Sequence, residues 1–161
     1  MTQVVREWRI AETAAVLSII ASTTPTTVYV DDDFSPVHET VIADGDLGTG
    51  AAEAALVGYD AFSTIAGAVP AVGAAGTIIV NDGDYSGENI TLADMVTLQL
   101  TDTAGPVQIG DIAAATTNAI DLQSNTLELG ATNASGTGID AIISGTGNLN
   151  KVGTGLLTIR A

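Results

Sequence analysis

Cysteine is absent from this chain of 161 residues, and histidine and aromatic residues are scarce. Without cysteine the chain can form no disulfide, no thiolate metal site and no cysteine nucleophile. One histidine and six aromatic side chains also leave little material for the acid–base groups on which most enzymes depend. These absences argue against a catalytic protein.

Basic residues are the second scarcity. Four Lys and Arg stand against 19 Asp and Glu, which gives a formal net charge of −15 at pH 7. A chain this acidic repels nucleic acid, anionic membranes and acidic polysaccharides at low salt. An acidic surface keeps a strand-rich protein from aggregating edge to edge, and cation binding is the alternative use of the same charge. No apolar run is long enough to predict a membrane span.

The stretch 58–100 changes from helical to strand periodicity. An apolar stripe predicts a helix over 60–73, capped by Asp60 or Ser63 and closed near Gly73. The stripe consists of Phe62, Ile65, Val69 and Val72, which are spaced i, i+3, i+7 and i+10. Short alternating or β-branched runs then predict strands at 77–80, 89–92 and 96–100, with a turn at 81–84.

Earlier in the chain, residues 28–30 predict a first strand that ends at a run of three aspartates. The segment 34–57 that follows is rich in turn residues and alanine. We interpret it as a long loop excursion with a short helix at 50–57, because solenoids place their variable features in such loops.

Two series of short strands recur after residue 96. The first begins at 97, 120 and 141, and the second begins at 107, 127 and 149. Interleaved series with a period of 20 to 23 residues are typical of a coil of parallel strands, in which each rung stacks on the next. The pattern predicts an all-β parallel solenoid of four or five rungs, with Ile, Leu and Val inside and Thr, Gln, Asp and Asn outside.

The run YDAFSTIAGAV followed by AAGTIIVNDGDYSGENITL resembles the opening of right-handed parallel β-helix (pectin-lyase-like) domains of large bacterial surface and secreted proteins. With the strand at Val28-Tyr29-Val30-Asp31, the resemblance covers residues 27–100. It implies a right-handed parallel β-helix. It specifies no single function, since the same opening is found in adhesins, lyases and proteins of unknown role.

The segment 145–159, GTGNLNKVGTGLLTI, is similar to the repeat in passenger domains of bacterial autotransporter adhesins. That second resemblance implies an extracellular or cell-surface location.

Residues 1–22 differ from the rest of the chain, since they contain no glycine and hold the only tryptophan. Their apolar spacing predicts an amphipathic helix that caps the solenoid or contacts another copy, and an imperfect export signal is the alternative. The expected organisation is this helix over 1–22 followed by one parallel β-helix domain over 23–161, which includes the excursion and the 60–73 helix.

Clustered aspartates are the only candidates for a metal site. Carboxylates in turns can coordinate calcium, although aspartate also favours turns by bonding its own backbone. The candidate calcium ligands are Asp31, Asp32, Asp33, Asp44, Asp46, Asp82 and Asp84. We predict no other cofactor.

Candidate catalytic groups are few, since Lys151, Arg160 and His38 are the only basic or imidazole side chains beyond residue 30. A polysaccharide lyase needs an Arg or Lys base beside calcium-binding carboxylates, and a hydrolase needs clustered acids. We therefore predict no catalysis. A carbohydrate-binding or remnant lyase-like β-helix is the alternative, and a line of outward tyrosines drawn from Tyr29, Tyr59 and Tyr85 would favour it.

The predicted function is structural. A short solenoid exposes unpaired strand edges at its ends, and these must be capped or stacked on another subunit. Head-to-tail stacking that does not close would propagate as a filament. The expectation is a non-catalytic bacterial extracellular or cell-surface module, adhesin-like or self-assembling, with a second copy of itself or a cell-surface glycan as partner.

Overall fold

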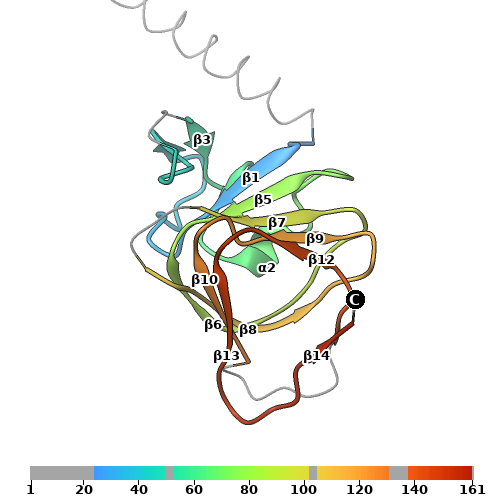
Figure 1. The fold of residues 1–161 in the computed structure, drawn as a ribbon. Helices are drawn as coiled ribbons and strands as arrows, with labels where there is room; N and C mark the ends of the chain where they lie inside the picture. The colour runs from blue at the N-terminus through green and yellow to red at the C-terminus, as the bar shows by residue number, and fades with distance from the viewer. Residues whose placement is uncertain (1–23, 50–52, 102–104, 131–137, 161) are drawn as a thin grey trace, which may run out of the picture.

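The computed structural model describes residues 24–49, 53–101, 105–130 and 138–160, and within them the chain forms a parallel β-solenoid of about three turns (Figure 1). The predicted solenoid is thus confirmed, with fewer rungs than the four or five expected. The predicted helix over 1–22 lies outside the described residues.

The first face is a six-stranded sheet in the order β12-β9-β7-β5-β1-β4. Its pairings are all parallel. The strands are β1 (Thr27–Val30), β4 (Ala61–Phe62), β5 (Thr77–Val80), β7 (Thr97–Leu100), β9 (Ala119–Asp121) and β12 (Ile142–Ser144). The predicted first series of strands therefore stacks as expected. The register differs from the alignment that the predicted starts implied: Ile120 is aligned with Leu98 rather than Thr97, and with Ile143 rather than Ala141.

The second face is a sheet in the order β13-β10-β8-β6. It contains β6 (Gly83–Thr91), β8 (Val107–Ala113), β10 (Thr126–Leu129) and β13 (Asn148–Lys151). Val107, Leu127 and Leu149 are aligned in register, which confirms the predicted second series residue by residue. Gly83 and Asp84, predicted as part of a turn, are the first two residues of β6.

A third face forms where β6 and β8 bend. The register between them shifts after Tyr85, so that Asn89–Thr91 pairs with Asp111–Ala113. Ala114 continues this face by bridging to β11 (Gly138–Ile139), which pairs with β14 (Thr158–Ile159). The repeated pattern of short strands and corners produces these three faces.

The core is a set of apolar columns inside the coil. The column Val28, Ile78, Leu98 and Ile120 is fully buried, and Leu127 and Ile139 are buried on the other two faces. Burying such side chains stabilises each by about 1.5–3 kcal/mol relative to solvent exposure. Alternation along β1, β7 and β10 thus places Val and Leu inside, as predicted.

The predicted helix at 60–73 is wrong in extent, since the only helical segment of that stretch is α2 (Ile65–Ala68). Ala61–Phe62 is a strand paired with β1, so no helix can begin there. Thr64, rather than Asp60 or Ser63, caps the helix, because its side chain accepts a hydrogen bond from the Gly67 N–H. All four residues of the predicted stripe nevertheless contact the core: Ile65 and Val72 are buried, and Phe62 and Val69 pack against the core cluster.

The excursion over 34–57 contains a small antiparallel pair, β2 (Val41–Ile42) and β3 (Ala55–Leu56). The predicted helix at 50–57 is wrong over 53–57, because Ala55–Leu56 is extended, and residues 50–52 lie outside the described residues. The excursion has its own apolar cluster, in which Phe34, Ala55, Val57 and Ala61 are buried, with Tyr29 and Ile42 packed against them. Figure 1 shows β3 beyond β1, at the N-terminal end of the stack. Among the described residues, no helix is long and apolar enough to cross a membrane.

Candidate assembly surface and aspartate corner

The C-terminal end of the solenoid presents free strand edges. β12 ends the first sheet and β13 ends the second. The Ile142 N–H is directed back toward the previous rung, where it donates to the Asn118 carbonyl at 3.2 Å. Alternate residues of a strand point their N–H groups to opposite sides, so the Ile143 N–H faces away from β9. An edge of this kind is a template for another strand.

Among the described residues, no layer covers the apolar columns at this end. Ile120, Leu127 and Ile139 are fully or almost fully buried, whereas the residues stacked above them are not. Ile159 is 48% exposed, and Ile142 and Leu156 are 68% and 66% exposed. We define the C-terminal face as Ile142, Ile143, Leu149, Leu156, Leu157 and Ile159. Its members come from β12, β13, β14 and the segment between the last two.

Sequence reasoning missed this surface, because it placed every Ile and Leu of the strands inside. The signal was present in the pairs Ile142-Ile143 and Leu156-Leu157. Two adjacent apolar residues in an extended segment point to opposite sides, so one of each pair must face outward.

The N-terminal end is closed differently. α2 packs there on β1, β4 and β6, with Ile65 and Ala68 fully buried. Glu88, in the irregular part of β6, accepts hydrogen bonds from the Ile65 and Ala66 N–H groups at 3.2 and 2.7 Å. A carboxylate at the first turn of a helix satisfies amides that have no partner within the helix. The two ends of the coil are therefore unlike.

Five of the candidate calcium ligands lie around one corner of the coil: Asp31, Asp32, Asp33, Asp82 and Asp84. The residues that follow β1, β5 and β7 stack there as Asp31, Asn81 and Thr101, and all three are buried. Asn81 is the central residue of this corner. Its Oδ1 accepts from the Leu47 N–H at 3.1 Å and from Thr101 Oγ1 at 3.3 Å, while its Nδ2 donates to the Gly45 carbonyl at 3.0 Å. The corner thereby anchors the excursion to the coil.

The aspartate carboxylates of this corner bond mainly to backbone N–H groups. Asp31 Oδ1 accepts from the Asp33 N–H at 2.8 Å, and Asp32 Oδ2 accepts from the Asp84 N–H at 3.0 Å. Asp84 Oδ1 in turn accepts from the Ser86 N–H at 2.9 Å. These bonds are those by which aspartate stabilises turns. Asp82 lies close enough to Gly105 that a Cβ added there would meet its carboxylate at 2.7 Å.

Asp44 and Asp46 belong to the excursion, on either side of Gly45, whose carbonyl accepts from Asn81. Asp46 is buried and its Oδ1 accepts from the Gly48 N–H at 3.1 Å. Asp44 Oδ1 is buried without a hydrogen-bond partner. Across the part of the chain that the structure describes, no group of three or more His, Asp or Glu side chains is arranged to hold a metal ion. Calcium binding by the seven aspartates stays a prediction.

Burial raises the pKa of Asp31 above its ordinary value, and the charges of Asp32, Asp33 and Asp82 act in the same direction against the hydrogen bond from Asp33. The folded chain then binds a proton more tightly at Asp31 than the unfolded chain does. The contribution of Asp31 to stability therefore falls as the pH rises through the ordinary aspartate range, and its charge is unfavourable at pH 7.

We expect Asp31→Asn to unfold at an equal or higher temperature than the wild type at pH 7, because the amide keeps the acceptor for the Asp33 N–H. The advantage should shrink below about pH 4, where the wild-type carboxyl is protonated too. Asp84→Asn is the opposite control, since hydrogen bonds from Ser86 lower the Asp84 pKa. Thermal unfolding at both pH values tests the pair. An Asp31→Asn variant that loses stability only at pH 7 contradicts the assignment.

The tyrosines do not form an outward line. Tyr85 is buried, its hydroxyl accepts from the Asp32 N–H at 3.1 Å, and burial strongly raises its pKa. The ring of Tyr29 packs beneath Gly45, where a Cβ would meet it at 2.6 Å. Tyr85 is thus in the core and Tyr29 is packed under the excursion, which leaves Tyr59 alone. The arrangement gives no support to a carbohydrate-binding face built from the three tyrosines.

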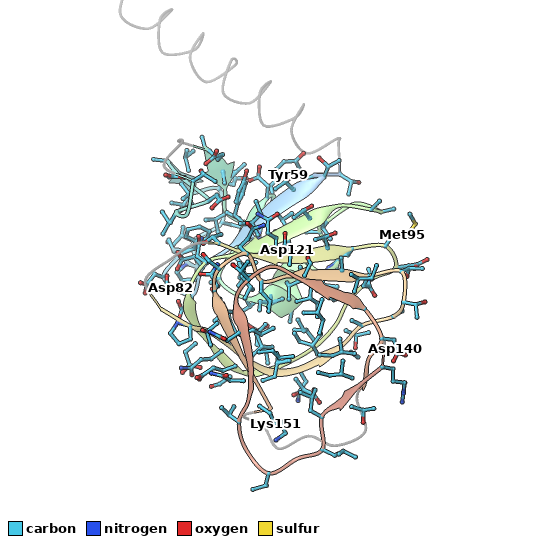
Figure 2. All side chains as sticks on the ribbon, viewed as in Figure 1. Tyr59, Asp82, Met95, Asp121, Asp140 and Lys151 are labelled. Atoms are coloured by element: carbon cyan, nitrogen blue, oxygen red, sulfur yellow. The ribbon has the colours of Figure 1, made fainter. Side chains whose placement is uncertain are left out.

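The candidate basic groups are dispersed. Lys151 Nζ donates to the carbonyls of Val152 and Gly153 at 2.7 and 2.8 Å, and Arg160 pairs with Asp140 at 3.1 Å. The His38 ring lies against Gly58, in the excursion. Figure 2 places Lys151 at the end of the view opposite Tyr59, the residue that follows Gly58. The structure does not bring Lys151, Arg160 and His38 together.

Comparison with known proteins adds no relative: no protein-family model matches the sequence, and no curated protein or solved structure is significantly similar to it. What these observations establish is a parallel β-solenoid of about three turns with two dissimilar ends.

Proposed function

We propose that this chain is a non-catalytic structural module of a bacterial extracellular or cell-surface protein, and that it self-associates through the C-terminal face. The observation that carries this proposal is the difference between the ends. One end has a helix packed over its core, whereas the other leaves apolar columns and free strand edges exposed. The resemblances to pectin-lyase-like and autotransporter adhesin β-helices support the extracellular or cell-surface location. We also propose that the coil is right-handed, as in those domains.

Two physical terms favour assembly at this surface. Covering the exposed parts of Ile142, Leu156 and Ile159 removes apolar area from water, at about 25 cal/mol per Å². A strand laid against β12 or β13 also gives partners to backbone groups that otherwise depend on water. Dispersed basic groups and a buried Tyr85 support a structural role over glycan cleavage or glycan binding.

The test is the mass of the purified protein in solution, measured by light scattering over a range of concentrations. We expect species larger than the 16.1 kDa chain, and their fraction should rise with concentration. Ile159→Asp should weaken self-association at least about tenfold, because a charge would have to be buried in the contact.

Met95→Asp is the matched control, since Met95 is also exposed but lies outside the C-terminal face. A monomer at every concentration, or equal weakening by both substitutions, would contradict the proposal. Repeating the measurement with calcium and then with a chelator tests the aspartates separately: loss of mass on chelation would give them a metal-dependent role.

A further inference from the structure

We infer, on the basis of the proposed function, that the C-terminal face of one copy docks on the N-terminal end of a second copy, against residues 34–49 of the excursion and the aspartates beside them. The occupant of the surface is thus a second copy of this chain in head-to-tail orientation. Three features of the described residues support this partner and this polarity.

The first feature is the distribution of charge along the coil. Residues 31–88 hold eleven Asp and Glu and no Lys or Arg, whereas residues 105–160 hold four acids and two bases. Lys151 and Arg160 are thus the only Lys and Arg side chains in the described residues, and both are exposed near the C-terminal face. Lys151 donates only to neutral carbonyls, so its charge is open to a carboxylate from outside.

The second feature is that the acids at the opposite end are accessible. Asp32, Asp33, Glu39 and Asp84 are exposed, and Asp84 lies on β6, the edge strand of the second sheet at that end. Tail-to-tail pairing would bring together two ends at which Lys151 is, among the described residues, the one basic group without a carboxylate partner, because Arg160 is paired with Asp140. Head-to-head pairing would bring two strongly acidic ends together. Head-to-tail contact alone sets opposite charges against each other, and like charges in contact exclude wrong partners.

The third feature is apolar. Val37, Val41 and Leu47, all in the excursion, are 64%, 71% and 53% exposed. Together with Ile142, Leu156 and Ile159, they account for six of the seven exposed large apolar side chains in the described part of the chain. These six therefore belong to the excursion after the first strand and to the last rung, and not to the middle rungs of the coil. A contact between unlike ends of this kind repeats without closing, and produces a linear assembly.

Disulfide trapping tests the polarity cleanly, because the natural chain contains no cysteine. Val41→Cys and Ile142→Cys are made separately, mixed and oxidised gently. We expect the mixed dimer in at least about tenfold excess over either homodimer, since a disulfide forms only when the Cα atoms come within about 7 Å. A chain carrying both cysteines should give a ladder of multimers.

The outcomes separate this inference from the function on which it rests. An Ile142→Cys homodimer as the main product would overturn head-to-tail docking and leave assembly through the C-terminal face intact. Absence of any mixed product also overturns the inference, and a monomeric mass would then overturn the proposed function as well. Lys151→Glu adds a charge test: it should weaken association about two- to fivefold, whereas Lys151→Arg should not.

Discussion

Leu98→Ala is expected to destabilise the fold by about 2–5 kcal/mol, the usual cost of a cavity at a fully buried leucine. Leu98 has no exposed surface and lies between Ile78 and Ile120 in the column behind the first sheet. Neighbouring rungs hold it on both sides, so the cavity cannot collapse easily. A loss of this size is a large share of the total stability of a small domain.

The control is Ile142→Ala, in the same sheet but at its open edge and 68% exposed. There the change in the free energy of unfolding should stay within about 0.5 kcal/mol. Chemical denaturation of both variants in dilute solution makes the comparison. Equal losses of stability in Leu98→Ala and Ile142→Ala would contradict the assignment of Leu98 to the inside of the coil and of Ile142 to the outside.

Asn81→Ala is the second large effect, and we expect a loss of about 2–4 kcal/mol, because a buried polar group left unpaired costs about 1–3 kcal/mol. The substitution removes the partner of the Leu47 N–H and of the Gly45 carbonyl at once. It also removes the acceptor for Thr101 Oγ1. The excursion should loosen from the coil as a result.

Asn150→Ala is the matched control, since Asn150 is exposed on β13. Its free energy of unfolding should stay close to that of the wild type. Limited proteolysis adds a local measurement: only Asn81→Ala should open the excursion to cleavage. An Asn81→Ala variant as stable as Asn150→Ala would mean that the corner does not hold the excursion.

The coil could be predicted from the sequence because its signal is local and repeated. Val107, Leu127 and Leu149 follow one another at the spacing of a rung, and like side chains must stack when parallel strands are in register. The helix was predicted too long for the opposite reason. Its spacing is helical, but the pairing of Ala61–Phe62 with β1 is a tertiary contact that overrides local preference.

The candidate surface was only partly accessible to sequence reasoning. The open strand edge follows from any short solenoid, and was expected. The outward direction of Ile142 and Leu156 depends on the register of their segments. A shift of one residue would turn Ile142 and Leu156 inward. The capping of α2 by Glu88 joins residues more than twenty positions apart, and no pattern in the sequence indicates it.

The central claim, that the C-terminal face is an assembly surface, is tested most directly by hydrogen exchange at backbone amides over a range of protein concentrations. The Ile143, Leu149 and Lys151 amides belong to the edge strands β12 and β13, and alternation directs them away from the preceding rung. We predict that their exchange slows as the concentration rises, while the amides of β7, inside the first sheet, exchange at a constant rate. Edge amides that exchange equally fast at every concentration would contradict the claim.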